Sequence, residues 1–391
     1  MSESKIGVFL IGVNGCVATA VTSGVFAIRR ELVKPYGLVT ELDEFKMLPL
    51  AGLGQLHFFG WDLRPQPHVD WALKHGTASE RILKAIMPDL TEVKVLQAPC
   101  GDASLNLDGA ATMRVSSHRE CIQTLMAQME SVRRQYHLDR LAVVNLASTE
   151  AIVRRTEAHE SLAAFECALH NSDDAITPGM LYAYASIMAG VPYVNFTPGF
   201  TADVPALIEL ALSRGVPIAG KDGKTGQTLY KTVLAPMFRM RNLRVRGWYS
   251  MNILGNDDGL ALQQPGRGEA KQATKRESLE HILGYNDVDH QVHIHYYRER
   301  GDAKEAWDVV DFLGWLETPM SIRVDWQGVD SALAAPLVID LVRMILLAQD
   351  RNEGGPAIHL AAFFKKPMGT TEHSFFEQLR TLHDYCSKAG N

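Results

Sequence analysis

The first 220 or so residues alternate between short apolar runs and longer stretches in which apolar positions recur with a helical period. The short runs have the length of buried strands, and they are residues 5–11, 37–40, 56–61, 141–146, 192–196 and 216–219. Helical stretches lie between them, among them residues 16–32, 120–134 and 180–189. This alternation predicts a mostly parallel sheet with helices on both faces, which is an α/β fold.

The pattern changes after about residue 225, where the apolar runs become longer. Residues 244–253 and 290–298 are predicted strands, and in the second of them His293 and His295 share one face, without an apparent third metal ligand. Such alternation is typical of an antiparallel sheet with one exposed or interfacial face. The chain then returns to helix, strand and helix, at residues 331–349, 357–364 and 372–387. We expect two closely packed domains, because no linker separates these regions.

The bulk composition is that of a soluble globular protein large enough for two domains. The chain has 391 residues, of which 46% are hydrophobic and 21% are charged. Its net charge of −6 argues against a nucleic-acid or membrane surface, since both normally require a basic excess. The five cysteines are scattered without a zinc or redox motif, which favours a reducing, cytoplasmic location.

Two apolar segments superficially imitate export or membrane signals. The first lies near the N-terminus, but Glu3 makes its leading region poorly basic and the run stops at Asn14, so we expect no export signal. The second, residues 333–347, contains Pro336 and Asp340. It is therefore predicted to be a buried helix and not a membrane span.

A glycine-containing turn, GVNGCVA at residues 12–18, follows the first predicted strand and precedes a predicted helix. A dinucleotide-binding unit begins in this way, with backbone N–H groups and a helix N-terminus close to the pyrophosphate. The expected cofactor contacts in this turn are Gly12, Asn14, Gly15, Cys16 and Val17. Asn14 stands where the full G-x-G-x-x-G motif has its second glycine, so an ordinary strand–helix turn is the alternative.

Polar residues follow two predicted strands at their carboxyl ends, where ligands bind in open parallel sheets. Asp62 ends the segment FFGWD, and Ser148 and Thr149 lie in NLASTE. A carboxylate in this position can accept hydrogen bonds from ribose hydroxyls, whereas the alternative is that Asp62 and Ser148 cap helices. No arginine closely follows Thr40 and Glu41, which disfavours a 2′-phosphate and therefore indicates NAD instead of NADP.

Two polar, glycine-rich segments follow predicted strands in the middle of the chain. AGKDGKTGQTLYKT, residues 219–232, leads into a helix and either offers backbone donors to an anion or simply caps the helix. NILGNDDGLAL, residues 252–262, gathers amide and carboxylate side chains at the end of a strand, and an exposed turn has the same composition. The sequence pattern of these two segments leaves both readings open.

Four lysines stand in unusual surroundings. Lys271 and Lys275 lie one helical turn apart in GEAKQATKRES, where like charges cost about 0.2–0.5 kcal/mol per pair. Lys304 lies in RERGDAKEAWD, and Lys365 directly follows an apolar run in AFFKKPM. Burial lowers the pKa of a lysine toward values that suit proton transfer, although most such lysines only extend their charge to solvent.

Together these segments resemble the myo-inositol-phosphate synthases, which convert glucose 6-phosphate into an inositol phosphate. The resemblance rests on FFGWD, NLASTE, GKDGKTGQTLYKTVLAPMF, GWYSMNILGNDDG, GDAKEAWD, DSALAAPLVIDL and FFKKPM. The Lys271 and Lys275 pair matches as well, so the resemblance spans nearly the whole chain.

The resemblance implies a Rossmann-type NAD-binding domain built from residues 1–225 and 326–391. Residues 226–325 would form a mixed α+β domain for catalysis and tetramerisation. The expected assembly is a homotetramer. The expected cofactor is NAD, which is recycled in each turnover, and the expected substrate is a sugar phosphate. An activating cation is a further candidate cofactor. Nucleic acid and membranes are not expected partners.

The functional positions of the family carry over residue by residue. The catalytic positions are Lys271, Lys275, Lys304, Lys365, Asp222, Asp258 and Asp330. The cofactor positions beyond the glycine turn are Asp62, Ala147, Ser148, Thr149, Asp222 and Asp302, of which Asp302 is also the candidate to hold a cation. The substrate positions are Thr225, Gly226, Gln227, Asn252, Leu254, Asn256, Lys275 and Lys304. The departures are Asn14 and Asp257, and the second touches the substrate region.

The implied reaction oxidises C5 of the sugar, forms an enolate at C6, closes the ring on the C1 aldehyde and reduces C5 again. Clustered lysines suit it because each intermediate carries a phosphate dianion and, at some stage, an oxyanion. We expect Lys271 and Lys365 at the C5 oxygen and Lys275 and Lys304 at the phosphate and the aldehyde. Residues 263–278 are expected to close over the substrate.

Three other functions remain open at this point. The same lysines would serve a carbocyclase that forms a five-membered ring from another sugar phosphate, for example fructose 6-phosphate. An ordinary NAD-linked dehydrogenase would accumulate NADH, whereas a cyclase would not. A non-catalytic NAD-binding protein would not need intact lysines and aspartates, so isomerase chemistry is the interpretation that the residues favour.

Overall fold

The computed structural model describes residues 4–101, 110–150, 153–255 and 279–387 of the 391-residue chain. Four of the predicted site residues lie outside the described residues, namely Asn256, Asp258, Lys271 and Lys275. The departure at Asp257 and the expected closure by residues 263–278 lie outside them too.

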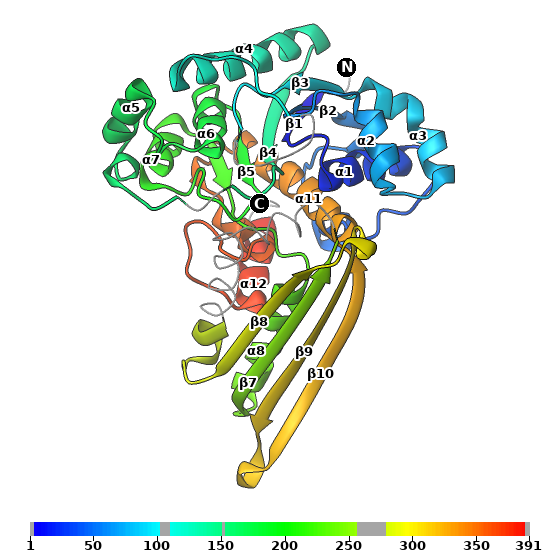
Figure 1. The fold of residues 1–391 in the computed structure, drawn as a ribbon, viewed down its shortest axis with the longest axis vertical. Coiled ribbons are helices and arrows are strands. Elements are labelled where there is room, and N and C mark those ends of the chain that lie inside the picture. Colours follow the sequence, from blue (N-terminus) through cyan, green and yellow to red (C-terminus); the bar gives the residue numbers. More distant parts are fainter. Residues whose placement is uncertain (1–3, 102–109, 151–152, 256–278, 388–391) are drawn as a thin grey trace.

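A seven-stranded sheet forms the larger part of the molecule, and its described strands all pair in parallel (Figure 1). They are β1 (Ile6–Ile11), β2 (Leu56–Asp62), β3 (Lys94–Gln97), β4 (Arg140–Asn145), β5 (Tyr193–Asn195), β6 (Pro217–Ala219) and β11 (Gly355–Pro356). The strand order is β3-β2-β1-β4-β5-β6-β11, which is the order of a dinucleotide-binding sheet extended by one strand. The predicted α/β fold with a mostly parallel sheet is therefore confirmed.

Helices cover both faces of this sheet, because its strands are apolar on both sides. Along β1, Val8 and Leu10 pack into one core, whereas Phe9 and Ile11 pack into the other. The first core lies against α1 (Cys16–Arg29), α2 (His68–His75), α3 (Glu80–Glu92), α11 (Asp330–Asp350) and α12 (Phe375–Ser387). The second core lies against α4 (His118–Tyr136), α5 (Leu162–Asn171), α6 (Pro178–Met188) and α7 (Pro205–Arg214).

A second sheet of four strands projects from the first as an elongated arm (Figure 1). It consists of β7 (Arg244–Leu254), β8 (Asp289–Tyr296), β9 (Ala303–Leu313) and β10 (Pro319–Val329), and α8 (Gln227–Met240) packs on one face. The order is β10-β9-β7-β8, with β9 antiparallel to both β10 and β7. The expected antiparallel arrangement is wrong for β7 and β8, which are parallel. The long connection between them allows the crossover that parallel neighbours need.

The predicted strand at residues 37–40 is replaced by a 3₁₀ turn, η1 (Val39–Glu41). The backbone N–H groups of Val39 and Thr40 donate to the Asp340 carboxylate on α11, at 2.8 and 3.0 Å. A contact between residues about three hundred positions apart has therefore taken the N–H groups that a neighbouring strand would have used.

The predicted strand at residues 357–364 is also wrong. Its pairing with β6 stops after Ala357 donates to the Ile218 carbonyl at 2.8 Å, and η7 (Ile358–Phe363) follows. Leu360 then donates back to the Ala357 carbonyl at 3.0 Å, so the local turn satisfies the backbone. The remaining 3₁₀ turns are η2 (Asp43–Phe45), η3 (Leu53–Gln55), η4 (Glu157–His159), η5 (Arg298–Arg300) and η6 (Trp315–Glu317).

The long helix α11 connects the two sheets. It begins directly after β10 and packs against the first core, where Val338, Leu341 and Ile345 are fully buried. Among the described helices it alone is long and apolar enough to cross a membrane, but 78% of its apolar window is buried inside the protein. The prediction of a buried helix in this part of the sequence is confirmed.

Candidate active site

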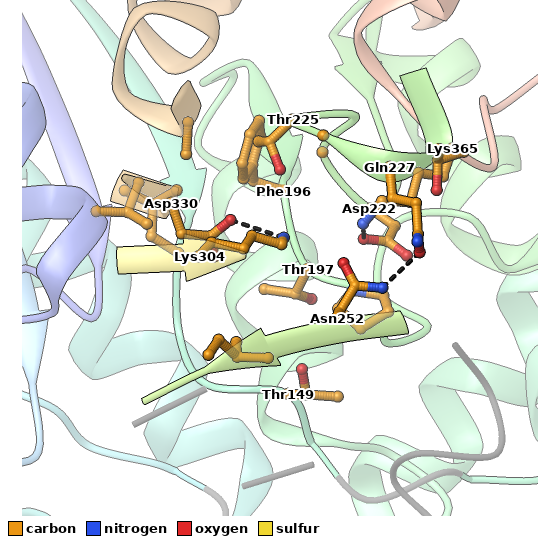
Figure 2. Close-up of a pocket in the computed structure, with 18 of the residues that line it drawn as sticks. Thr149, Phe196, Thr197, Asp222, Thr225, Gln227, Asn252, Lys304, Asp330 and Lys365 are labelled. Atoms are coloured by element: carbon orange, nitrogen blue, oxygen red, sulfur yellow. Dashed lines mark hydrogen bonds and ion pairs between the residues drawn. The ribbon is translucent and has the colours of Figure 1, made fainter. Parts of the chain in front are cut away.

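A cleft of about 930 Å³ lies where the carboxyl ends of the parallel strands face the second sheet (Figure 2). Its walls come from the loops after β4, β5 and β6, from the start of α8, and from β7, β9 and α11. The predicted catalytic and substrate residues on these walls are Asp222, Thr225, Gly226, Gln227, Asn252, Leu254, Lys304, Asp330 and Lys365. Both sheets therefore contribute to one site.

A second cavity of about 680 Å³ adjoins the cleft, and Leu146 and Ala147 line both. The predicted cofactor residues on its walls are Gly12, Gly15, Asp62, Ala147 and Ser148. Val17, Thr149 and Asp222 line the cleft instead. The shared wall at Ala147 suits two ligands that must react with each other.

The turn between β1 and α1 has the geometry that a bound pyrophosphate requires. Gly12 has a φ of +78°, and a β-carbon there would lie 3.0 Å from the Ala147 Cα, so a side chain would obstruct the turn. The N-cap of α1, Gly15, makes no side-chain hydrogen bond to the first turn of the helix. Glycine thus leaves room for an anion at the helix N-terminus, and the turn fits a dinucleotide such as NAD.

The environment of Asn14 explains why asparagine can replace the second glycine of the motif. Its side-chain amide donates to the carbonyls of Arg64 and Gln66, at 2.8 and 3.0 Å, and its backbone N–H donates to Asp62 Oδ2 at 2.9 Å. Asn14 is fully buried. It braces the segment after β2, and neither Asn14 nor Cys16 lines the cleft or the second cavity.

Asp62 ends β2 with its carboxylate on the wall of the second cavity. Its Oδ1 accepts a hydrogen bond from the Arg64 N–H at 2.9 Å, in addition to the Asn14 bond. Burial raises the pKa of Asp62, whereas these N–H groups and the Arg64 guanidinium lower it. Asp62 is not a helix cap, because the next helix begins only at His68. The carboxylate is fixed where ribose hydroxyls could donate to it.

A lysine–aspartate pair lies on one side of the cleft (Figure 2). Lys365 Nζ donates to Asp222 Oδ1 at 2.6 Å, and the Lys365 backbone N–H donates to the Asp222 carbonyl at 2.7 Å. A β-bridge between Gly223 and Phe364 holds the same two segments together. The Lys365 side chain is 16% exposed, so this partly desolvated ammonium is stabilised by an adjacent carboxylate.

A second lysine–aspartate pair lies on the other side of the cleft (Figure 2). Lys304 on β9 donates through Nζ to Asp330 Oδ1 at 2.9 Å, and Asp330 is the first residue of α11. Asp302 supports this arrangement, because its carbonyl accepts the Asp330 N–H at 3.1 Å and its Oδ2 accepts the Ser331 N–H at 3.3 Å. Asp302 thus caps α11 from a neighbouring segment.

A cation at Asp302 stays a prediction. Its Oδ2 also accepts a hydrogen bond from the Ser331 hydroxyl. Within the described part of the chain, no group of three or more His, Cys, Asp or Glu side chains could hold a metal ion. This finding covers His293 and His295 as well, which stack on one another along β8.

The start of α8 and Lys304 form a candidate anion site. The N-cap of α8 is Gly226, which has no side chain, so the N-cap residue itself does not occupy the N–H groups of the first turn. A β-carbon at Gly226 would lie 3.9 Å from Lys304 Nζ. A helix N-terminus carries partial positive charge and the ammonium adds a full charge, so together they fit a phosphate dianion.

Sequence reasoning missed several residues of the site. Phe196 and Thr197 line the cleft after β5, and their position at the carboxyl end of a predicted strand was the available signal. Lys224 lies in the glycine-rich turn but is buried, with Nζ donating to Gln378 Oε1 at 2.6 Å. Burial lowers the pKa of Lys224 to about 7, and the charge of Lys365 is the second cause.

Comparison with known proteins gives a consistent result over the whole chain. A family model for an NAD-binding domain, described as myo-inositol-1-phosphate synthase, matches residues 6–386. Inositol-3-phosphate synthase 1 of Bacteroides thetaiotaomicron is 37% identical over 392 residues, which cover 95% of this chain and 91% of that protein.

Two solved structures have the same fold. Inositol-3-phosphate synthase of Caenorhabditis elegans aligns over 100% of this chain and 86% of its own, with a TM-score of 0.90 and 22% identity. A myo-inositol-1-phosphate synthase-related protein of Thermotoga maritima aligns over 98% of both chains, with a TM-score of 0.81 and 23% identity. The fold of an NAD-binding domain joined to a second, mixed sheet is therefore shared with these proteins.

Proposed function

The chain belongs to the NAD-binding myo-inositol-1-phosphate synthase family, and from this premise we propose that it cyclises D-glucose 6-phosphate to 1D-myo-inositol 3-phosphate. The observation that carries the proposal is the pair of lysine–aspartate contacts, Lys365 with Asp222 and Lys304 with Asp330, in one cleft beside the cofactor cavity. The reaction is an isomerisation without net oxidation. NAD, when bound, would take hydride from C5 and return it after ring closure.

We assign the phosphate of the substrate to the start of α8 and Lys304. The helix N-terminus and the ammonium face the same part of the cleft, near Gly226. Anchoring the phosphate there would fix one end of the open-chain sugar and leave its other carbons to reach across the cleft. Asp330 accepts from Lys304 and keeps that ammonium charged and oriented.

We assign the C5 oxygen to Lys365. In its neutral form the Lys365 amine can take the C5 hydroxyl proton as the carbon is oxidised. The ammonium formed in this way can then stabilise the oxyanion when the C6 enolate forms. Asp222, at 2.6 Å, holds the Lys365 Nζ in place. The buried amine of Lys224, whose pKa is lowered to about 7, adds a group close to this pair that changes protonation near neutral pH.

Lysines suit this chemistry better than arginines, because a lysine can release and regain a proton near neutral pH when it is desolvated. Lys271 and Lys275, which lie outside the described residues, complete the proposed set of cations. A plain dehydrogenase would need one proton acceptor at the oxidised carbon, whereas a cyclase must also stabilise an enolate and polarise an aldehyde. The two separate lysine–aspartate pairs support the cyclase.

The experiment that tests this proposal supplies NAD and either D-glucose 6-phosphate or fructose 6-phosphate and identifies the product ring by NMR. We expect a six-membered cyclitol phosphate from glucose 6-phosphate and no build-up of NADH. A five-membered ring from fructose 6-phosphate would transfer the proposal to the alternative carbocyclase. Stoichiometric NADH with an open-chain product would refute cyclisation.

A matched pair of variants connects the activity to the cleft. Lys365→Met removes the ammonium from the cleft, whereas Lys84→Met removes a 69% exposed lysine from α3. We expect the first variant to lose nearly all turnover while it still binds NAD, and the second to keep the activity of the unmodified enzyme.

We also propose that the enzyme works as a homotetramer in the cytoplasm. The tip of the second sheet, between β9 and β10, exposes Trp315, Leu316 and Met320, which are apolar side chains that another subunit could cover. All five cysteines are free thiols, which suits a reducing compartment. Light scattering of the purified enzyme measures the assembly state, and a monomer at micromolar concentration would refute the tetramer.

A further inference from the structure

A buried polar chain runs from the core of the second sheet to the wall of the cleft. Gln227 Nε2 donates to Asp308 Oδ2 at 3.1 Å, and Asn252 Nδ2 donates to Gln227 Oε1. All three residues are at most 3% exposed, and Gln227 and Asn252 also line the cleft. This row of hydrogen bonds therefore connects Asp308, which lies outside the cleft wall, with a polar group that the substrate can contact.

The local sequence explains why these residues meet. Asn252 lies on β7 on the same face as Ser250 and Trp248, because side chains on a strand alternate. Asp308 on β9 is paired with Ser250 in the sheet register. Gln227 is the first residue of α8, which packs on this face of the sheet.

Asp308 is fixed as a hydrogen-bond acceptor. The Trp248 indole N–H, which can only donate, contacts Asp308 Oδ1 at 2.9 Å, and the Ser250 hydroxyl donates to the same oxygen. Burial has the larger effect on the pKa of Lys231 and lowers it, but the charge of Asp308 raises this pKa, so the two groups interact electrostatically. Both carboxylate oxygens of Asp308 thus face donors.

An acceptor at Asp308 determines the orientation of both amides. Gln227 must turn its NH₂ group toward the carboxylate, which leaves its Oε1 toward Asn252. Asn252 must then turn its NH₂ group toward Gln227. Figure 2 shows the result, with the Asn252 oxygen directed away from Gln227 and into the cleft.

We infer that Asp308 is a positioning residue for substrate recognition: through Gln227 it makes Asn252 present an acceptor oxygen to the substrate. A substrate group that binds there must be a donor, which in a sugar phosphate means a hydroxyl. This inference rests on the proposed function, under which C1 and C5 react. The hydroxyl that donates to Asn252 Oδ1 is therefore the one at C2, C3 or C4.

A charge-swapped pair of variants tests the inference. In Asp308→Asn the Trp248 indole and the Ser250 hydroxyl still donate to the side-chain oxygen, so the NH₂ group of the new asparagine faces Gln227. Gln227 must then turn its oxygen toward residue 308 and its NH₂ group toward Asn252. Asn252 reverses in response and presents its NH₂ group to the cleft. In Asp308→Asn combined with Gln227→Glu, the new carboxylate accepts from both neighbours and restores the Asn252 orientation. A defect caused only by looser packing would not be repaired by this second change.

The expected results separate recognition from folding. Asp308→Asn should raise the KM for glucose 6-phosphate about tenfold, as expected when one substrate hydrogen bond is lost, with little change in NAD affinity or melting temperature. The double variant should return the KM close to that of the unmodified enzyme. An unchanged KM in the single variant, or no recovery in the double variant, would overturn the inference.

Deoxy analogues identify the hydroxyl. We compare the 2-deoxy, 3-deoxy and 4-deoxy forms of glucose 6-phosphate with glucose 6-phosphate itself. With the unmodified enzyme, one of these analogues should react poorly. With Asp308→Asn, the same analogue should show no such loss of reactivity relative to glucose 6-phosphate. Equal penalties in both proteins for all three analogues would also overturn the inference. Turnover of glucose 6-phosphate by the unmodified enzyme tests the proposed function separately, so the two failures are distinguishable.

If Asp308→Asn does not fold, Gln227→Glu alone supplies the test. Two facing carboxylates at 227 and 308 must share a proton, and residue 227 still accepts from Asn252 in that state. Once that proton is lost at higher pH, the two carboxylates repel each other and residue 227 is displaced from Asp308, so Asn252 loses its fixed orientation. The ratio of the KM of this variant to that of the unmodified enzyme should therefore stay low at acidic pH and rise as the pH increases. A ratio that does not depend on pH would count against the inference.

Discussion

Lys231 makes the stability of the second domain depend on pH. It lies on α8 and is 1% exposed, with Nζ 2.5 Å from His290 Nε2 and 5.7 Å from the centre of the Trp248 ring. Burial lowers its pKa from 10.5 to about 7, although the charge of Asp308 opposes this shift. The perturbation that we choose is Lys231→Met, which keeps the length of the side chain and removes the amine.

The direction in which the free energy of unfolding changes with pH follows from proton binding. In the unfolded chain the lysine holds its proton up to about pH 10.5, whereas in the folded protein it releases the proton near pH 7. The unfolded state therefore binds more protons between these two values, and the free energy of unfolding rises with pH across that window. Between pH 7 and pH 9 the rise due to this one group is roughly 2 kcal/mol. The Lys231→Met variant lacks it.

The assay compares urea unfolding of the two proteins at pH 7 and at pH 9, at one protein concentration, by circular dichroism and tryptophan fluorescence. The measured quantity is the difference in the free energy of unfolding between the two proteins, and only its change from pH 7 to pH 9 is interpreted. A constant cost of removing the His290 contact therefore cancels, and so does the contribution of Lys224. The unmodified protein should gain roughly 2 kcal/mol over the variant on going from pH 7 to pH 9. Lys84→Met, at an exposed position, should show no such change. If the free energies of unfolding of the unmodified protein and Lys231→Met differ by the same amount at pH 7 and at pH 9, the reasoning is refuted.

Three further predictions concern the cleft and the cofactor cavity. Gly226→Ala places a β-carbon 2.8 Å from Trp326 Cζ2, so it should displace the start of α8 and raise the KM for the sugar phosphate about tenfold; an unchanged KM would argue against a phosphate there. Asp62→Ala should weaken NAD binding by roughly 1.5–3 kcal/mol in a fluorescence titration, and unchanged NAD affinity would remove Asp62 from the ribose site. Asp222→Asn leaves the Lys365 ammonium without its charged partner, so kcat should fall on the order of a hundredfold with little change in KM. An unaltered kcat would exclude that role.

The predictions that held are those that depend on local pattern. Apolar runs followed by glycine or polar residues predicted β1, β2, β4, β5 and β6, and in an open parallel sheet the residues after such strands meet at one edge. The sequence pattern therefore places Asp62 and Ser148 near the same ligand, and they line one cavity. Motif resemblance added the residues of the cleft that come from distant segments.

The predictions that failed depend on contacts far apart in the chain. Residues 37–40 have strand-like composition, but the Asp340 carboxylate takes the N–H groups of Val39 and Thr40. The parallel pairing of β8 with β7 depends on the path of a long connection, which periodicity does not reveal. Asp308 looks like any strand aspartate in GDAKEAWD, and only the packing of α8 shows that it is buried and orients Gln227.

The central claim is that C5 is oxidised and reduced again within one cleft. It is tested most directly with D-glucose 6-phosphate that carries deuterium at C5, turned over many times with a small amount of NAD. The account predicts that mass spectrometry finds the deuterium retained in the inositol phosphate, and that no reduced cofactor accumulates. Transfer of the deuterium to released NADH, together with an oxidised open-chain sugar, would contradict it.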